Sequence, residues 1–213
     1  MPRRRRSHAF TLIEMLVVIG VIGILLALLV PALGPSSGRA LDGATHQFTA
    51  DLENARLIAI AERTRTRVLL PLTQTDFASP SPAPTPWPSD ITRRGYVIMS
   101  QKPTETVWRQ RGKWTRLPQG IALQTVVQPS PSPTPSAIPV DIAGTGAINY
   151  TFNGPFIEFL ANGSSSLDPS ASPATAATLA DGFVDSAGAF KAKNVNLKSI
   201  ITIDPLTGSA TVK

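Results

Sequence analysis

The chain opens with a short basic stretch, and one long apolar run follows it. Every residue from 10 to 30 is apolar or glycine except Thr11 and Glu14. A helix of these 21 residues would be roughly 31 Å long, which is close to the hydrocarbon thickness of a bilayer. A helix on a soluble core has a polar face, and this segment has none. The pattern therefore predicts a transmembrane helix over residues 10–33, with a helix break at Pro31, where the chain should leave the bilayer.

Helical periodicity resumes after the prolines and glycines that follow residue 30. Apolar residues then recur at steps of three or four up to about Arg63, which predicts an amphipathic continuation of the helix over residues 34–64. Its apolar stripe would cover a sheet, although a helix lying on the membrane surface is the alternative. The stripe consists of Leu41, Ala44, Phe48, Leu52, Ala55 and Ala59.

From residue 65 onward the hydrophobic period shortens toward two, which indicates strands. A turn at residues 204–208 should close a hairpin at the end of the sequence. One long N-terminal helix followed by mostly antiparallel strands is an α+β architecture, with a β-rich domain over residues 65–213. The predicted strands cover residues 68–70, 96–99, 106–108, 121–127, 156–159, 200–203 and 210–212.

Proline is concentrated in two short windows. Ten of the 20 prolines lie in residues 80–88 and 129–139. Alternating proline cannot complete a β ladder, so these windows predict surface loops at about 79–90 and 128–139. The stretch at 167–180, rich in Ser, Pro, Ala and Thr, is expected to be a third loop.

Composition excludes several kinds of site. The chain has no cysteine and only two histidines, so a disulfide framework, a thiolate metal site and a histidine-rich metal centre are ruled out. The net charge of +6 depends on the leader: without Arg3 to Arg6, 16 basic side chains face 14 acidic ones. The remaining chain is therefore nearly neutral.

Residues 9–16, with the sequence Ala-Phe-Thr-Leu-Ile-Glu-Met-Leu, resemble the processing motif of type IV prepilins and type II secretion pseudopilins. The resemblance implies that residues 1–9 are a leader, which prepilin peptidase removes by cutting between Ala9 and Phe10. The same enzyme would then methylate the amine of Phe10. One departure is Ala9, because the family usually has glycine before the cut.

The resemblance also gives Glu14 a role in assembly. Cleavage leaves a positive amine on Phe10, and in a filament a neighbouring subunit's amine could approach Glu14 within the membrane. Two unit charges about 4 Å apart attract by about 1 kcal/mol in water, and by several times more at low dielectric. The implied partners are prepilin peptidase, other pilin-type subunits and the inner membrane.

Arginines before the apolar run also determine the expected topology. Arg3 to Arg6 should hold that end in the cytoplasm, so the β-rich domain would lie in the periplasm of a single-pass protein of the bacterial inner membrane. We expect no enzyme, no cofactor and no small-molecule substrate.

Several features downstream are similar to minor pseudopilins of the H type, and this similarity implies a subunit of a type II secretion filament with a pilin-like fold. A minor type IV pilin is the alternative. The features, in chain order, are residues 55–61 leading into 67–70, Trp114 with 117–121, residues 161–165, and the terminal hairpin at 203–212.

Other interpretations of the sequence are weaker. A conventional signal peptide, cut after residue 32, would release a secreted domain that begins at Leu33. Residues 34–38 match the Gly-x-Ser-x-Gly pattern of serine hydrolases, but only His46 follows as a base. Residues 181–185 offer oxygen ligands for calcium without the spacing of a standard loop, so no metal site is predicted.

Nucleic-acid binding is the more serious rival function. Seven basic residues face one acid between Arg93 and Arg116, and aromatic residues lie among them. Such a mixture could hold single-stranded DNA by phosphate contact and base stacking, although a solvated face around packed tryptophans is favoured. The candidate contacts are Arg93, Arg94, Trp108, Arg109, Arg111 and Trp114.

Overall fold

The computed structural model describes residues 12–33, 37–78, 91–127, 136–140, 148–167 and 174–213. The chain divides into two compact units, Met1–Ser36 and Ser37–Lys213. In the first unit the described residues form one helix, α1 (Leu12–Leu33), which continues through Pro31 and ends just beyond it.

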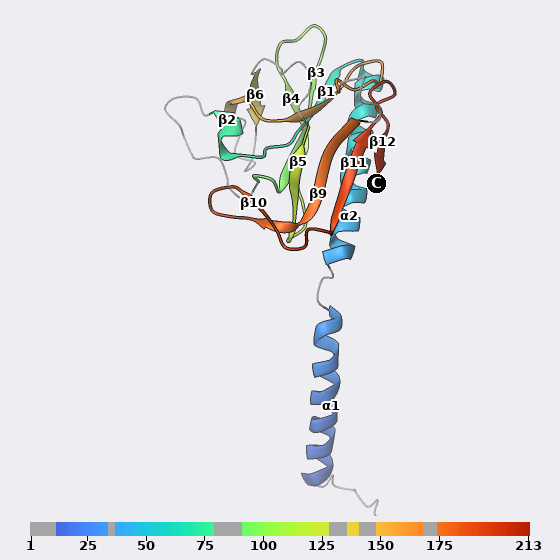
Figure 1. The fold of residues 1–213 in the computed structure, drawn as a ribbon, viewed down its shortest axis with the longest axis vertical. Helices are drawn as coiled ribbons and strands as arrows, with labels where there is room; N and C mark the ends of the chain where they lie inside the picture. The colour runs from blue at the N-terminus through green and yellow to red at the C-terminus, as the bar shows by residue number, and fades with distance from the viewer. Residues whose placement is uncertain (1–11, 34–36, 79–90, 128–135, 141–147, 168–173) are drawn as a thin grey trace, which may run out of the picture. The chain divides into compact units, whose positions relative to one another are not determined.

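In the described residues of the second unit, one α-helix combines with antiparallel sheets (Figure 1). Helix α2 (Ser37–Glu62) precedes a short 3-10 turn, η1 (Gln74–Asp76), and the strands. The α+β class is therefore confirmed. A single long helix is not confirmed, because residues 34–36 between α1 and α2 lie outside the described residues. The pilin fold itself stays a prediction.

Where the chain is described, its strands form three sheets, and neighbouring strands are antiparallel throughout. The first has the order β4-β3-β1-β8, the second has the order β10-β9-β11-β12 with β5 also paired to β9, and the third has the order β2-β7-β6. The strands are β1 (Arg65–Leu69), β2 (Phe77–Ala78), β3 (Gly95–Gln101), β4 (Arg109–Arg116), β5 (Ile121–Val126), β6 (Ser136–Val140), β7 (Ile148–Phe152), β8 (Phe156–Phe159), β9 (Ala174–Val184), β10 (Phe190–Ala192), β11 (Lys198–Ile203) and β12 (Ala210–Val212).

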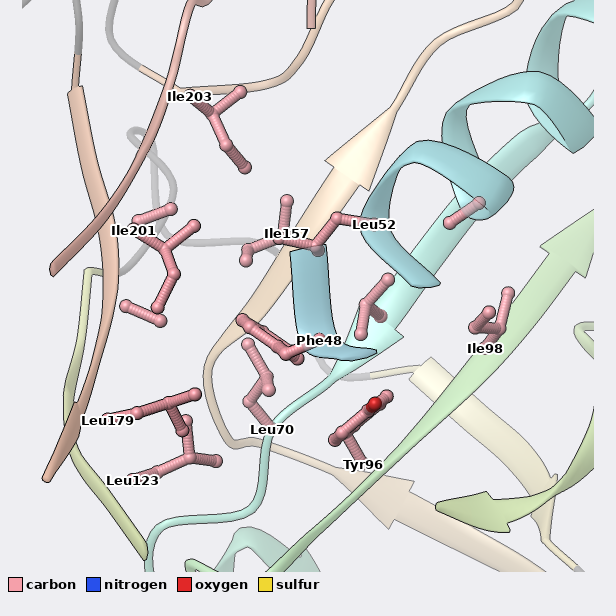
Figure 2. Close-up of a cluster of buried hydrophobic side chains, with 14 of the residues drawn as sticks. Phe48, Leu52, Leu70, Tyr96, Ile98, Leu123, Ile157, Leu179, Ile201 and Ile203 are labelled. Atoms are coloured by element: carbon pink, nitrogen blue, oxygen red, sulfur yellow. The ribbon is translucent and has the colours of Figure 1, made fainter. Parts of the chain in front are cut away.

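Helix α2 buries its apolar stripe against the first two sheets. Phe48 and Leu52 are fully buried and face Leu70, Ile157 and Ile201 (Figure 2). Each such side chain stabilises the fold by roughly 1.5–3 kcal/mol relative to its exposed state. The buried positions of α2 include all six residues of the predicted stripe.

Strands β1 and β3 of the first sheet are buried on both faces. On β1, Val68 belongs to the cluster under α2, whereas its neighbour Leu69 belongs to a second cluster on the other face. Strand β3 divides in the same way, with Ile98 under α2 and Val97 opposite. Two-sided burial explains the continuous apolar runs at residues 68–70 and 96–99.

Most of the predicted strands are confirmed, and so is the terminal hairpin, in which Ile201 pairs with Val212. The strand predicted at 106–108 is wrong, because these residues follow a turn and β4 begins at Arg109. Val107 is 53% exposed there, so the short apolar run does not mark a sheet position.

Two of the predicted loops are also wrong in part. The loop expected at 167–180 contains the start of β9, whose Ala176 and Ala177 are fully buried between β5 and β11. Alanine and threonine are weak strand signals, and here pairing on both edges outweighs local preference. The proline-rich window at 128–139 ends in β6. This strand lies at the edge of its sheet, so Pro139, which has no N–H, removes no hydrogen bond to a strand beyond β6. The window at 79–90 lies outside the described residues.

Candidate functional site: the N-terminal segment and the basic region

The candidate assembly residue Glu14 lies in the first turn of α1. A carboxylate at this position interacts favourably with the partial positive charge at the helix N-terminus. Ala9 and Phe10, the expected cleavage positions, lie outside the described residues. Their processing therefore stays a prediction.

The side chains of α1 are unburied along the whole part that the structure describes, from Leu12 to Leu25. Leu12 is 83% exposed and Ile19 is 68% exposed, and the other large apolar residues of this stretch are similar. An apolar surface of this extent needs lipid or another protein to cover it. Among the described residues, no helix has both the length and the apolar character needed to cross a membrane.

The basic region between residues 93 and 116 is distributed over several elements. Arg93 has a positive φ of 59°, and its half-buried guanidinium donates to the carbonyl oxygens of Leu123, Gln124 and Gly188 at 3.0–3.1 Å. Burial lowers the pKa of Arg93, against the opposing effect of the Asp76 charge. Arg93 therefore joins β5 to the turn after β9.

Trp108 is buried and is covered by a second arginine. The guanidinium carbon of Arg67 lies 4.3 Å from the Trp108 ring centroid and 4.1 Å from that of Phe156. The ring of Trp108 is thus not exposed for stacking on a base. Trp114 is half-buried and makes an edge contact with Phe77, with ring centroids 6.1 Å apart.

Two arginines of β4, Arg109 and Arg111, form ion pairs within the chain. The Arg109 guanidinium donates to Glu105 at 3.0 Å, and Arg111 pairs with Glu62 of α2 and donates to Ser100 at 2.7 Å. Arg94 is half-buried beside Arg93. Nucleic-acid contact by this region stays a prediction, and within the described residues Trp108 is buried while Arg93, Arg109 and Arg111 bond to other groups of the chain.

Sequence reasoning missed a buried ion-pair network on β1 and β8. Glu158 accepts from Arg67 at 2.8 Å and from Arg65 at 2.6 Å, and both Glu158 and Arg67 are buried. Desolvation lowers the pKa of Arg67, and the charge of Glu158 opposes this shift. The available signal was a glutamate inside the apolar run at 156–159 and an arginine directly before the apolar run at 68–70.

Asp181, Asp185 and His46 are the remaining candidate ligands or bases from the sequence. Asp181 is buried on β9, and Asp185 accepts from the backbone N–H groups of Ala187 and Ala189 at 3.0 and 2.8 Å. His46 is an exposed residue of α2. In the part of the chain that the structure describes, no three His, Cys, Asp or Glu side chains come together as a metal site.

Comparison with known proteins identifies the N-terminal segment. Residues 4–30 match the prokaryotic N-terminal methylation motif. No curated protein and no solved structure matches the chain. The motif supports the type IV prepilin and pseudopilin family and indicates a type IV pilin-like precursor that prepilin peptidase processes. That family consists of structural precursors rather than enzymes, and its motif implies assembly with other pilin-type subunits.

Proposed function

We propose that this chain is a minor pseudopilin-like subunit of an inner-membrane-anchored filament in a type II secretion system. The observation that carries the proposal is the methylation motif at residues 4–30, in which Phe10 and Glu14 follow a basic leader. Prepilin peptidase cleaves before Phe10, and the mature helix joins the filament.

The proposed topology follows from charge and length. A helix of residues 10–30 would be about one bilayer thickness long, and the leader arginines would keep its N-terminus in the cytoplasm. Residues 37–213 then lie in the periplasm. The exposed apolar side chains of Leu12 to Leu25 support this role, because lipid covers them before assembly and neighbouring helices cover them afterwards.

Assembly depends on charge complementarity at the filament axis. The methylated amine of Phe10 on one subunit approaches Glu14 of a neighbour, in surroundings where water screens the attraction poorly. This pairing favours subunits that are staggered along the axis over isolated anchors.

The choice of a secretion pseudopilin rests on the order of downstream features. Residues 55–61 leading into 67–70, Trp114 with 117–121, and the hairpin at 203–212 follow the order found in the H type. A minor type IV pilin remains the alternative function, and DNA capture by it is disfavoured by the buried ring of Trp108 and the internal bonds of Arg93.

Mass spectrometry of the mature N-terminus tests the proposal. A chain that begins with N-methylated Phe10 is expected, and it should be lost in cells without prepilin peptidase. A chain that begins at Leu33 would instead mean conventional secretion and would overturn the proposal.

A deletion strain separates the two filament systems. Loss of the gene should leave secreted enzymes in the periplasm if the filament serves secretion. Loss of surface pili or of DNA uptake, with normal secretion, would assign the subunit to a type IV pilus.

A further inference from the structure

Strands β9 and β10 form a hairpin, and β10 lies at an edge of the second sheet (Figure 1). The turn closes through Asp185, whose N–H donates to the carbonyl of Ala189 at 3.0 Å and whose carbonyl accepts from the N–H of Gly188 at 2.9 Å. Gly188 has a φ of 82°, which glycine adopts readily. The Asp185 carboxylate also accepts from the N–H groups of Ala187 and Ala189. The turn therefore determines the register of β10 on β9.

This register decides which main-chain groups of β10 point out of the sheet. The N–H of Lys193 donates to the carbonyl of Asp181 at 3.0 Å, which makes these residues a hydrogen-bonded pair. Such pairs alternate with non-hydrogen-bonded pairs along an antiparallel ladder, so the N–H and C=O groups of Phe190 and Ala192 face away from β9. Among the described residues, no hydrogen bond reaches these outward groups. We call them the β10 edge.

The β10 edge is open to a partner. Residues 191–196 are exposed without a break. Phe190 is half-buried because its ring packs on Gly182, where an added Cβ would come within 2.5 Å of the ring carbon Cε2. Contact with β9 therefore holds β10 in place and leaves its other edge free.

Two lysines lie on one face of the β10 edge. Lys191 is the cross-strand partner of Phe183, and Lys193 follows two residues later, so both side chains lie on the same face. Both lysines are exposed, and no ion pair between described residues includes either of them. The two acids of the hairpin do not neutralise them, because Asp185 holds the turn and Asp181 is 3% exposed.

We propose that the β10 edge binds an extended acidic segment of another protein as an added antiparallel strand. The outward groups of Phe190 and Ala192 form main-chain hydrogen bonds with the segment, and acidic side chains at alternate positions face Lys191 and Lys193. Lys191 takes a non-hydrogen-bonded position toward the added strand, where paired Cα atoms are only about 4.5 Å apart. The inference concerns the Ser37–Lys213 unit alone and does not rest on the proposed function.

Charge favours an acidic partner over a second copy of this edge. Antiparallel pairing that uses both outward residues of each copy would place Lys191 opposite Lys191, and like charges directly opposite each other destabilise a sheet. Lysines on edge strands protect sheets from such self-pairing. A segment with acids at alternate positions turns the same lysines into favourable cross-strand partners.

Binding of short synthetic peptides to the full chain in detergent tests this inference. The probe is fluorescein-labelled Val-Glu-Val-Glu-Val, and the charge control has lysine in place of glutamate. Two further peptides carry N-methyl groups, either on the valines or on the glutamates. When the glutamates face the lysines, only the valine N–H groups point at β10, so methylation of the valines removes the ladder bonds and keeps the charge. The readout is fluorescence polarisation.

The glutamate peptide should bind saturably at concentrations below about 1 mM. The valine-methylated peptide and the lysine peptide should bind roughly tenfold more weakly or worse, whereas the glutamate-methylated peptide should bind as the unmodified one does. Lys191→Gln and Lys193→Gln should each weaken binding by up to about fivefold. Lys198→Gln is the matched control, since Lys198 is also exposed but pairs with Ala180 on the opposite face of the sheet, and it should leave binding unchanged.

Three results would overturn the inference. Equal binding of the two methylated peptides would mean attraction by charge without an added strand. An equal loss in Lys198→Gln and Lys191→Gln would place the peptide elsewhere on the chain. Absence of saturable binding by the glutamate peptide would show that the β10 edge does not accept an acidic strand.

None of these outcomes touches the proposed function, which is tested separately by the mature N-terminus.

Discussion

At the scale of single residues, a few polar groups carry roles that their surroundings determine. Tyr96 of β3 donates its hydroxyl to Asp51 of α2 at 2.6 Å and makes an edge contact with Phe48, with ring centroids 4.9 Å apart. This contact ties the helix to the first sheet. In the N-terminal segment, Glu14 is the polar group with a proposed role. Its proposed partner is the amine of Phe10 on another subunit.

Replacement of Glu14 should separate insertion from assembly. We expect Glu14→Gln to insert into the membrane as the wild type does but to form few filaments, because the neutral amide cannot pair with the amine of Phe10. Membrane flotation reports insertion, and the amount of sheared, pelleted filament reports assembly. Since Gln has nearly the same shape as Glu, normal filament yield would contradict the charge pairing.

The Tyr96 phenol predicts a pH dependence of stability. Burial, followed by the hydrogen bond to Asp51, raises the pKa of Tyr96 well above its ordinary value of 10.0. Above about pH 10 the unfolded state therefore loses a proton that the folded state keeps, and the free energy of unfolding falls by up to about 1.4 kcal/mol per pH unit.

Urea unfolding between pH 8 and 12 checks this prediction. Tyr96→Phe should lower stability by about 1–2 kcal/mol at neutral pH and should flatten the decline above pH 10. If the variant and the wild type decline with the same slope, another group governs the alkaline transition.

At the scale of elements, β1 and β8 are joined by their ladder and by the Arg65–Glu158–Arg67 network beneath Trp108. A buried charge without its partner is far more costly than an exposed one, because water cannot solvate it. The ion pair between Glu105 and Arg109 is the exposed counterpart in the same unit.

Removal of either glutamate should show this difference. Glu158→Gln leaves Arg67 buried without its counter-charge and should lower the free energy of unfolding by about 3–5 kcal/mol. Glu105→Gln, the matched control at the surface, should leave it almost unchanged. Chemical denaturation of both variants measures the difference, and comparable small losses would show that the network contributes little.

The elements also show where local sequence patterns mislead. Strand β4 has the sequence RQRGKWTR, in which few apolar residues mark a period. The sequence predicts no strand over these residues and instead predicts one at 106–108, which is wrong. Strand β9 pairs with β5, β10 and β11, yet its alanines and threonines resembled a loop. Both strands are defined by their partners rather than by their own preferences.

At the scale of the whole molecule, the chain consists of two compact units with different surfaces. The unit at Ser37–Lys213 has its own core under α2, whereas the described side chains of α1 are exposed and apolar. A unit with a complete core should fold without the rest of the chain.

A fragment of residues 37–213 tests this independence. We expect a soluble fragment that unfolds in one cooperative transition, with the same midpoint as this unit has in the full chain in detergent. The full chain without detergent should aggregate through its exposed apolar helix. A fragment that shows no cooperative transition would mean that the outer unit requires the N-terminal segment.

Features that depend only on residues close together in the chain can be predicted from the sequence. The leader, the apolar run, Glu14 and the methylation motif are local, and so are the stripe of α2 and the strands with strong apolar runs. Tertiary structure alone decided which polar groups are buried. Whether Arg67 meets Glu158, whether Trp108 is covered and whether residues 174–184 form a strand depend on contacts between segments far apart in the chain, because burial and pairing are properties of the folded neighbourhood.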